Sequence, residues 1–324
     1  MASIREVAKL AGVSVATVSR VLNEKGYVSE EARKKVQKAI DELDYRPNAV
    51  ARSLFKKQSQ TIGLMVPDIV NPFFPELARA VEDTLAKHGY TVILCNTDEN
   101  AEKERTYLEM MMQKYIDGII VASNTLSASQ VTKYKIPVVS IDREISKELP
   151  SIMVENKKGA AMAVRFLKEK GRQRIAHLKG PDYVPNALER CRGYLDEVEN
   201  ESWFQESYIA DGQYDMTASF NATVHLLQKH PEIDAIFAGN DLSAIGAIKA
   251  IYKLGKKVPE DVAVVGFDGI MLSESTTPEL TTVAQPIYEI GERAATALVN
   301  IIEKQPMEET YVKLDVQLIE RQST

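Results

Sequence analysis

The segment from Ile4 to Asn23 reads I-R-E-V-A-K-L-A-G-V-S-V-A-T-V-S-R-V-L-N, and its apolar spacing predicts two short helices joined by a tight turn. Ser3 is a good N-cap for the first helix, with Glu6 placed to complete a capping box. Gly12 can take the left-handed conformation that ends a helix, and Ser14 can cap the next one. The outer face of the second helix would then carry small, hydroxyl, arginine and asparagine side chains. Such a face fits a helix-turn-helix that enters a DNA major groove, although a plain helical hairpin has the same spacing.

The residues that follow favour the DNA-binding interpretation. Val15, Val18 and Leu22 are predicted to form the apolar face of the second helix. Ser29 is predicted to cap a third helix, which would complete a minimal three-helix core. Residues 45–54 then read Y-R-P-N-A-V-A-R-S-L, in which a proline breaks the chain before a short, potentially helical basic segment.

These motifs, V-A-x-x-A-G-V-S-x-x-T-V-S-R-V-L-N followed by Y-R-P-N-x-x-A-R-x-L, resemble the DNA-binding headpiece of the lactose-repressor (LacI/GalR) family. The resemblance implies double-stranded operator DNA as a partner, and a hinge helix after the proline that inserts Leu54 into the minor groove. The DNA-binding residues that we expect are Ser3, Ser14, Val15, Ala16, Thr17, Ser19, Arg20, Asn23, Ser29, Tyr45, Asn48, Ala51 and Leu54.

Charge is distributed unevenly along the chain. Residues 1–57 carry 12 Lys/Arg against 7 Asp/Glu, out of 40 and 46 in all, so the remaining residues carry 28 against 39. A basic arm on an acidic body places the contact with nucleic acid in the arm. Cys95 and Cys191 are isolated, as in a reduced cytosol, and neither a signal peptide nor a membrane-spanning apolar run is present. We therefore expect a cytoplasmic protein that does not contact a membrane.

After a polar linker, short apolar runs alternate with amphipathic helices, and the pattern restarts after Glu155. Two successive strand–helix units predict two lobes with parallel sheets, whose ligands bind at the carboxyl ends of the strands. The chain carries no G-x-G-x-x-G after the first of these strands and no P-loop, which argues against a nucleotide. We therefore divide the chain into an all-α headpiece (1–46), a hinge helix and linker (47–60), and a two-lobed α/β core that also dimerises (61–324).

Polar and aromatic side chains follow several of the predicted strands, so they should meet in the cleft between the lobes. Aromatic rings cover the apolar face of a sugar, while carboxylates, amides and guanidinium groups satisfy its hydroxyls. The predicted ligand-binding residues are Asn71, Phe73, Phe74, Asp142, Arg143, Arg190, Asn240, Asp268 and Gln285. Taken singly, the two phenylalanines could be core residues, and Asp142-Arg143 could be a structural ion pair. Asn240 and Asp268 could cap the helices that follow them.

The same segments resemble the ribose-type sugar-binding proteins and the repressors built on them. The matching motifs are N-P-F-F, D-R, the arginine before R-G-Y, F-A-x-N-D, G-F-D-G and A-Q-P. Within the LacI/GalR family, the whole chain looks most like the ribose operon repressors of Gram-positive bacteria. The resemblance implies a periplasmic-binding-protein-like core and a homodimeric repressor. It also implies that a small sugar, ribose, releases this repressor from its operator.

Two positions depart from the ribose-type pattern. The ribose-type site has an aromatic residue after the A-D of one loop, whereas Ala210-Asp211 leads here to Gly212. It also has an asparagine at the end of the third strand, where this chain has small residues. Tyr214 or Asn124 could substitute.

Other functional classes have less support in the residues. The four histidines lack metal-ligand spacing, and no serine lies in a G-x-S-x-G elbow. Asp142 and Asp268 could imitate an acid–base pair, but each has a simpler role as an acceptor for hydroxyls. We expect no enzyme activity, no catalytic residue, no metal and no cofactor. The alternatives are a periplasmic sugar carrier, a catabolite-control regulator that answers to a phosphorylated protein, and a repressor that responds to another sugar or to a corepressor.

Overall fold

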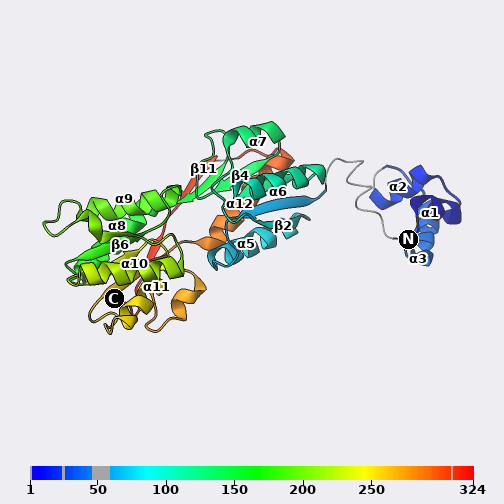
Figure 1. The fold of residues 1–324 in the computed structure, drawn as a ribbon. Coiled ribbons are helices and arrows are strands. Elements are labelled where there is room, and N and C mark those ends of the chain that lie inside the picture. Colours follow the sequence, from blue (N-terminus) through cyan, green and yellow to red (C-terminus); the bar gives the residue numbers. More distant parts are fainter. Residues whose placement is uncertain (1, 24–25, 46–58, 308) are drawn as a thin grey trace. The chain divides into compact units, whose positions relative to one another are not determined.

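The computed structural model describes residues 2–23, 26–45, 59–307 and 309–324, without the side chains of Asn23 and Thr132. The chain divides into two compact units, Met1–Ser59 and Gln60–Thr324 (Figure 1). The predicted hinge segment lies almost wholly outside the described residues.

The described residues of the first unit form three helices, α1 (Ile4–Ala11), α2 (Val15–Asn23) and α3 (Glu30–Glu42). The predicted caps are confirmed. Ser3 and Glu6 form the capping box of α1, and Gly12 ends that helix with a φ of 65°. The Ser14 hydroxyl accepts a hydrogen bond from an amide in the first turn of α2, and Ser29 does the same for α3. These short polar side chains therefore fix where each helix begins.

The apolar face of α2 differs from the prediction at one position. Val18 and Val21 are buried and Leu22 packs against the same cluster, but Val15 is 42% exposed. Val15 is the first residue of the helix, so its side chain lies beyond the small core that α1 and α3 complete. The prediction that Val15 packs inside was therefore wrong, and its side chain is available at the surface.

The second unit is built from strands and helices in the alternation that the sequence predicts. Its strands are β1 (Thr61–Val66), β2 (Thr91–Asn96), β3 (Gly118–Val121), β4 (Val138–Ile141), β5 (Ser151–Val154), β6 (Ile175–Lys179), β7 (Ile209–Asp211), β8 (Ala235–Ala238), β9 (Ala263–Asp268), β10 (Thr281–Ala284), β11 (Tyr311–Leu314) and β12 (Gln317–Ile319). Its α-helices are α5 (Phe73–Lys87), α6 (Ala101–Gln113), α7 (Ala128–Tyr134), α8 (Asn156–Glu169), α9 (Pro185–Val198), α10 (Met216–Lys229), α11 (Asp241–Lys253) and α12 (Ile287–Glu303). Two short 3-10 helices are η1 (Glu206–Tyr208) and η2 (Met271–Glu274).

These strands form two six-stranded sheets, one in each lobe (Figure 1). The strand order is β11-β5-β4-β3-β1-β2 in the first lobe and β12-β10-β9-β8-β6-β7 in the second. Neighbouring strands run parallel, except that β12 is antiparallel to β10. Central strands such as β1 and β9 are buried almost throughout because helices cover both faces of each sheet. The predicted two-lobed α/β fold is confirmed.

The lobes are not successive in the chain, which corrects the expectation that everything after Glu155 forms the second lobe. Helix α12 packs on α5, and β11 pairs with β5, so both belong to the first lobe. The chain crosses between the lobes after β5, after β10 and again after β11. Residues 311–319 contribute two strands, and these belong to different sheets: β11 pairs with β5 and β12 pairs with β10.

His177 lies in the core of the second lobe, on β6. Its ring stacks between Tyr194 and Phe237, with centroid distances of 5.0 and 4.9 Å. Its Nδ1 is 2.9 Å from the carbonyl oxygen of Phe237, which fits a neutral ring protonated at Nδ1. Burial lowers the pKa of His177 to about 4.

We expect His177→Gln to remove part of the acid sensitivity of this lobe. In the wild type, the unfolded chain binds a proton near pH 6.5 and the folded chain only near pH 4. Stability is therefore lost as the pH falls through this window, by up to about 3 kcal/mol, at about 1.4 kcal/mol for each pKa unit. Urea unfolding at pH 7 and pH 4.5 measures this loss. Replacement of the exposed His225 by Gln is the control and should keep the wild-type loss. An unchanged loss in His177→Gln would contradict the assignment.

Candidate functional site

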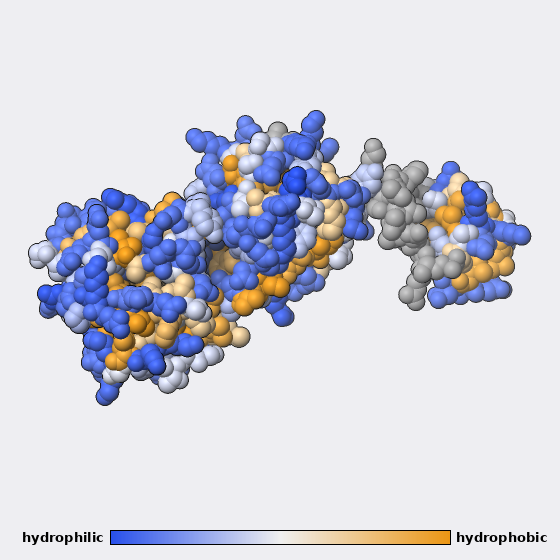
Figure 2. Space-filling view, viewed as in Figure 1, coloured by the Kyte–Doolittle hydropathy of each residue, from blue (hydrophilic) through white to orange (hydrophobic). Residues whose placement is uncertain are grey.

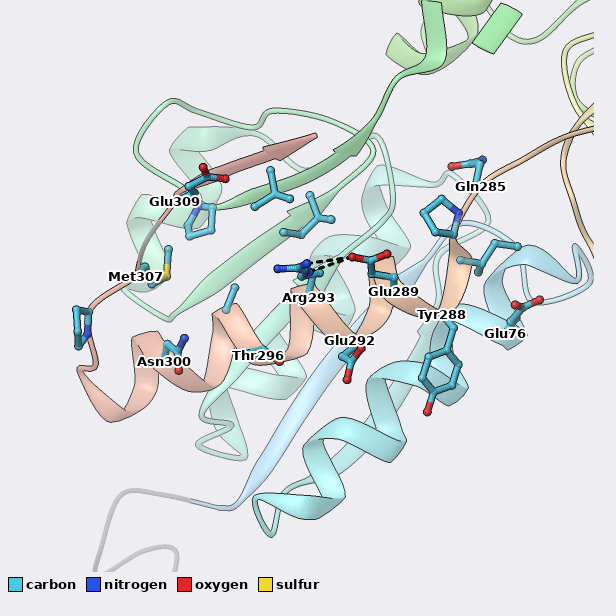
Figure 3. Close-up of a pocket in the computed structure, with 17 residues that line it drawn as sticks. Glu76, Gln285, Tyr288, Glu289, Glu292, Arg293, Thr296, Asn300, Met307 and Glu309 are labelled. Atoms are coloured by element: carbon cyan, nitrogen blue, oxygen red, sulfur yellow. Dashed lines mark hydrogen bonds and ion pairs between the residues drawn. The ribbon is translucent and has the colours of Figure 1, made fainter. Parts of the chain in front are cut away.

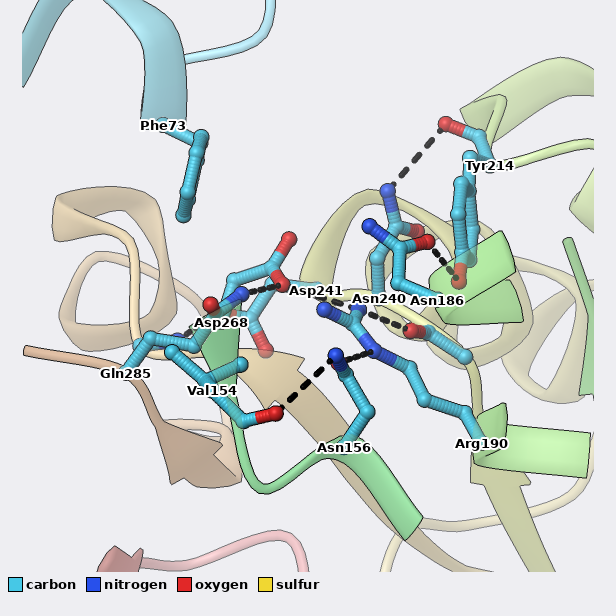
Figure 4. A network of polar contacts seen from close by, with 12 residues as sticks. Phe73, Val154, Asn156, Asn186, Arg190, Tyr214, Asn240, Asp241, Asp268 and Gln285 are labelled. Carbon is cyan, nitrogen blue, oxygen red and sulfur yellow. Dashed lines mark hydrogen bonds and ion pairs between the residues drawn. The ribbon is translucent and has the colours of Figure 1, made fainter. Parts of the chain in front are cut away.

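A cavity of about 460 Å³ lies between the lobes, where the carboxyl ends of both sheets meet. The predicted residues that line it are Asn71, Phe73, Phe74, Asp142, Arg190, Asn240, Asp268 and Gln285. The first lobe supplies the phenylalanines and Asp142, the second lobe supplies Arg190 and Asp268, and Gln285 lies where the chain crosses back after β10. In Figure 4, Phe73 lies across from the polar side chains of the second lobe.

The centre of the polar network is Arg190 of α9, which is only 2% exposed. Its Nε donates to Asn156 Oδ1 at 2.8 Å, and its Nη1 donates to the carbonyl of Gly239 at 2.7 Å and to Asp268 Oδ1 at 3.0 Å (Figure 4). The guanidinium lies 3.8 Å from the ring centroid of Phe267. These contacts fix the charge in one position at the base of the cavity.

The Asp268 carboxylate is held by Arg190 and by Gln285, whose Nε2 donates to it at 2.7 Å. Burial raises the pKa of Asp268, and the Arg190 charge opposes this. Asp268 does not cap the following turn. Asp241 does so, since its Oδ2 accepts from the amides of Gly269 and Ile270 at 2.8 and 2.9 Å. Burial and the Asp268 charge raise the pKa of Asp241 to about 8.

Two oxygens of the cavity lining are shielded from solvent and have no hydrogen-bond partner, Asp142 Oδ1 and Gln285 Oε1. Asp142 is half-buried as a residue, but this oxygen is covered. Burial raises the pKa of Asp142 to about 6, although Arg190 and a hydrogen bond from Asn186 oppose the shift. A buried acceptor without a donor is costly, so both oxygens are suited to the hydroxyl groups of a ligand.

Two of the predicted asparagines have local partners. Asn240 Oδ1 accepts from the amide of Ser243 at 2.9 Å, and its Nδ2 donates to the carbonyl of Tyr214 at 3.3 Å. Asn71 Oδ1 accepts from the amide of Phe73 at 3.1 Å. The helix-cap alternative therefore describes Asn240, which begins α11. Both residues still border the cavity, but much of their hydrogen-bonding capacity is already used.

Arg143 is the one predicted ligand residue outside the cavity lining. It does not pair with its neighbour Asp142; its Nη1 donates to the carbonyl of Asn124 at 2.8 Å. Burial lowers the pKa of the Arg143 guanidinium, and the negative charges of Glu104 and Glu99 oppose this shift. Its side chain thus supports the loop after β3 from behind. The D-R motif alone does not reveal this, because adjacent side chains that leave a strand end can point to opposite sides.

Further polar residues line the cavity, among them Asn124, Asn186 and Tyr214. The sequence had suggested Asn124 and Tyr214 as substitutes for missing residues. Tyr214 lies beside Arg190, and the distance from its ring centroid to the guanidinium carbon of Arg190 is 5.6 Å. The Tyr214 hydroxyl donates to Asn186 Oδ1 at 3.3 Å. Asn186 was missed, because an asparagine in the first turn of a helix carries no signal of its own.

A second hollow of about 930 Å³ runs along α12 in the first lobe (Figure 3). Its charged lining consists of four glutamates and Arg293, and the arginine is paired with Glu289 at 3.1 Å. Among the described residues, only Gln285, which borders both hollows, offers it a shielded polar atom without a partner. The interlobe cavity is therefore the better ligand site, and the groove would repel a phosphate group.

Two family models match the chain. Residues 3–48 match the bacterial regulatory proteins of the lacI family, and residues 59–322 match the periplasmic binding proteins and sugar binding domain of the LacI family. The chain belongs to the LacI family. Members of this family are transcriptional regulators, which agrees with the helix-turn-helix unit and the interlobe cavity.

Relatives and solved structures match between 82% and 100% of the chain. The ribose operon repressor of Halalkalibacterium halodurans is 47% identical over 100% of this chain and 97% of its own. The lac repressor dimer bound to operator and the anti-inducer ONPF superposes with a TM-score of 0.88 at 27% identity, over 99% and 98% of the two chains. A LacI-family regulator from Enterococcus faecium with bound ribose superposes with a TM-score of 0.74 at 29% identity. The match covers 82% of this chain and 98% of that one.

Several of the predicted DNA-binding residues lie at the surface of the headpiece of this LacI-family chain. Ser14, Val15, Ala16 and Arg20 are exposed on or beside α2, and Thr17 and Ser19 are half-buried. Ser3 and Ser29 serve as helix caps, and Tyr45 packs against the small core. The Asn23 side chain and the predicted residues Asn48, Ala51 and Leu54 lie outside the described residues. Tyr27, which is not among the predicted DNA-binding residues, is almost fully exposed.

Among the residues that the structure describes, no cluster of His, Cys, Asp and Glu side chains could hold a metal ion. No described helix combines the length and the apolar character needed to cross a bilayer.

We expect Arg190→Met to destabilise the second lobe strongly, because it leaves the buried Asp268 carboxylate without its counter-charge. Breaking such a pair costs about 3–5 kcal/mol. The matched control is Arg192→Met on the same helix, where an exposed arginine pairs with Asp196 at 2.9 Å and the cost should stay within about 1 kcal/mol. Thermal and urea unfolding of both variants measures the difference. Equal losses would show that the Arg190 network does not support the fold.

Proposed function

We propose that this LacI-family regulator is a homodimeric, cytoplasmic repressor of a ribose-utilisation operon, which D-ribose releases from operator DNA. The observation that carries the proposal is the pair of shielded, unpaired acceptors, Asp142 Oδ1 and Gln285 Oε1, in the lining of a cavity that also contains the fixed guanidinium of Arg190. The proposal divides the chain into a headpiece at 1–46, a hinge helix and linker at 47–60, and a sugar-binding and dimerisation core at 61–324.

The chemistry of the cavity suits a small neutral molecule with several hydroxyl groups. Hydroxyls can donate to the two free acceptors and accept from amide and guanidinium N–H groups, so each would be satisfied out of water. The ring of Phe73 faces the polar network and would cover the apolar face of a furanose or pyranose (Figure 4). The names of the H. halodurans repressor and of the ribose-bound E. faecium regulator support ribose among such sugars.

The headpiece would read the operator through α2. Arg20 would donate to bases or phosphates, and Val15 and Ala16 are suited to contact with thymine methyl groups. The predicted hinge residue Leu54 would then insert between base pairs in the minor groove. A protein that binds operator DNA must be in the same compartment as the chromosome, and we therefore propose a cytoplasmic location.

A homodimer is supported by the first lobe. Strand β2 is an edge strand that exposes apolar side chains, and Leu94 on it is 45% exposed. Hydrophobic colour gathers over α5 and β2 in Figure 2. An open, apolar sheet edge favours pairing with another chain. A two-fold dimer would also match a near-palindromic operator.

A ligand between the lobes would couple the two ends of the molecule. Asp142 belongs to the first lobe and Asp268 to the second, so a sugar that contacts both favours one lobe arrangement over others. The sugar can change the affinity for DNA only by as much as its own affinity differs between those lobe arrangements. The crossings after β5, β10 and β11 are where the lobes can move relative to one another.

We expect Asp268→Asn to give a repressor that binds operator normally but no longer responds to D-ribose. Asparagine keeps an oxygen that can accept from Arg190 and Gln285, so we expect the fold to be retained. Loss of the charged acceptor should cost about 1–3 kcal/mol of ligand affinity. Operator affinity titrated with D-ribose measures the response, and Asp315→Asn, an exposed aspartate paired with Lys158, is the control. If another sugar, but not ribose, weakens wild-type operator binding, ribose is the wrong effector and the mechanism stands. If no sugar does so, the proposed function fails.

We also expect the affinity for ribose to decrease as the pH is lowered, because Asp142 becomes protonated. Its pKa is raised to about 6, so the carboxylate acceptor is present at pH 7 and is lost below pH 6. At pH 5 only about a tenth of it is ionised, which predicts roughly tenfold weaker binding if the carboxylate is required. Calorimetric titrations at pH 7 and pH 5 test this. Asp142→Asn should bind weakly at both pH values; a pH dependence that persists in this variant would assign the effect to another group.

A further inference from the structure

The interlobe cavity has two parts of different character. Its inner residues, Arg190, Asn240, Asp268 and Gln285, are each less than a tenth exposed. Its mouth is formed by apolar side chains from opposite lobes that remain largely in solvent: Val70 is 81% exposed and Tyr183 is 61% exposed. Val70 lies on the loop between β1 and α5, and Tyr183 on the loop between β6 and α9.

The volume of the cavity exceeds the needs of a single pentose. A pentose occupies roughly the space of four to five water molecules, about 130 Å³ at about 30 Å³ each. The cavity offers about 460 Å³. With a sugar in contact with the inner polar groups, most of the volume remains, and it is the part next to Val70 and Tyr183.

The outer part is lined for an apolar or aromatic group. Besides the exposed Val70 and Tyr183, the apolar lining of the cavity includes Phe74 from the first lobe and Met216 and Leu242 from the second. Exposed apolar side chains are costly to hydrate, so covering them with a flat hydrophobic group lowers the free energy. Aromatic rings and methionine are also the side chains that adapt best to a planar ring.

The charges around the cavity select against anions. The acidic residues that line it are Asp68, Glu99, Asp142, Asp215 and Asp268, and the basic lining residue is Arg190, which already pairs with Asp268. A phosphate group would therefore meet a negative field without a free cation among the described lining residues. A neutral substituent meets no such penalty.

We infer that the outer part of the cavity is a second subsite, for an uncharged aromatic group carried by the sugar, so that neutral ribonucleosides bind as effectors. The inference rests on the proposed placement of ribose against the inner polar groups. It adds that the base of the nucleoside lies between the loops that carry Val70 and Tyr183, and that phosphate esters are rejected.

Calorimetric titration of the full-length protein with D-ribose, uridine and D-ribose 5-phosphate tests this. We expect uridine to bind about tenfold more tightly than ribose and the phosphate ester at least tenfold more weakly. Tyr183→Ala should weaken the binding of uridine about tenfold and the binding of ribose less than twofold. The control is Tyr252→Ala, an exposed tyrosine on α11 away from the cavity, which should change neither. Val70→Ser tests the facing loop independently and should also weaken uridine alone.

The outcomes separate this inference from the proposed function. Binding of ribose without binding of uridine overturns the subsite and leaves the ribose repressor intact. Equal weakening of both ligands in Tyr183→Ala also overturns it, since the residue would then support the whole cleft. Binding of uridine without ribose, with the expected loss in Tyr183→Ala, supports the subsite and overturns ribose as effector. Binding of neither overturns both.

Discussion

The second lobe is organised around one buried cation. The guanidinium of Arg190 has left water, and such a transfer is unfavourable unless fixed acceptors replace the lost hydration. The replacements come from distant parts of the chain: the side chain of Asn156 where the first crossing ends, the carbonyl of Gly239 after β8, and the carboxylate of Asp268 at the end of β9. These strand ends must converge for the charge to be satisfied, so the same interaction shapes the cavity.

The network also explains why the remaining polar groups are available to a ligand. Asp268 is engaged by Arg190 and Gln285, and Asp241 holds the turn that follows it. With these contacts made inside the second lobe, Asp142 Oδ1 and Gln285 Oε1 remain as shielded acceptors. One belongs to the first lobe and the other to a crossing segment. A sugar that satisfies both stabilises a particular lobe arrangement, which is what an effector must do to change DNA affinity.

The parts of the fold that the sequence predicts are those governed by local interactions. Ser3, Ser14 and Ser29 cap their helices because each hydroxyl reaches an amide within its own first turn. Strands such as Thr61–Val66 are recognised because burial on both faces requires a continuous apolar run. The return of α12 and β11 to the first lobe depends on contacts between residues far apart in the chain, so no local pattern encodes it. For the same reason the sequence could not show that Arg143 supports a loop, or that Asn186 borders the cavity.

The distribution of charge keeps the two binding activities apart. The headpiece and hinge segment are basic, and the rest of the chain is acidic. Phosphates of DNA are therefore attracted to the first fifty-odd residues and repelled elsewhere. In the core the same acidity continues into the lining of the interlobe cavity, where the single cation is already paired. A molecule with a phosphate group thus gains nothing from the core, while a neutral polyol gains hydrogen bonds there. The site can therefore respond to a sugar in a cell rich in nucleotides and nucleic acid, because the negative charge of the lining repels phosphate groups whatever the shape of the rest of the molecule.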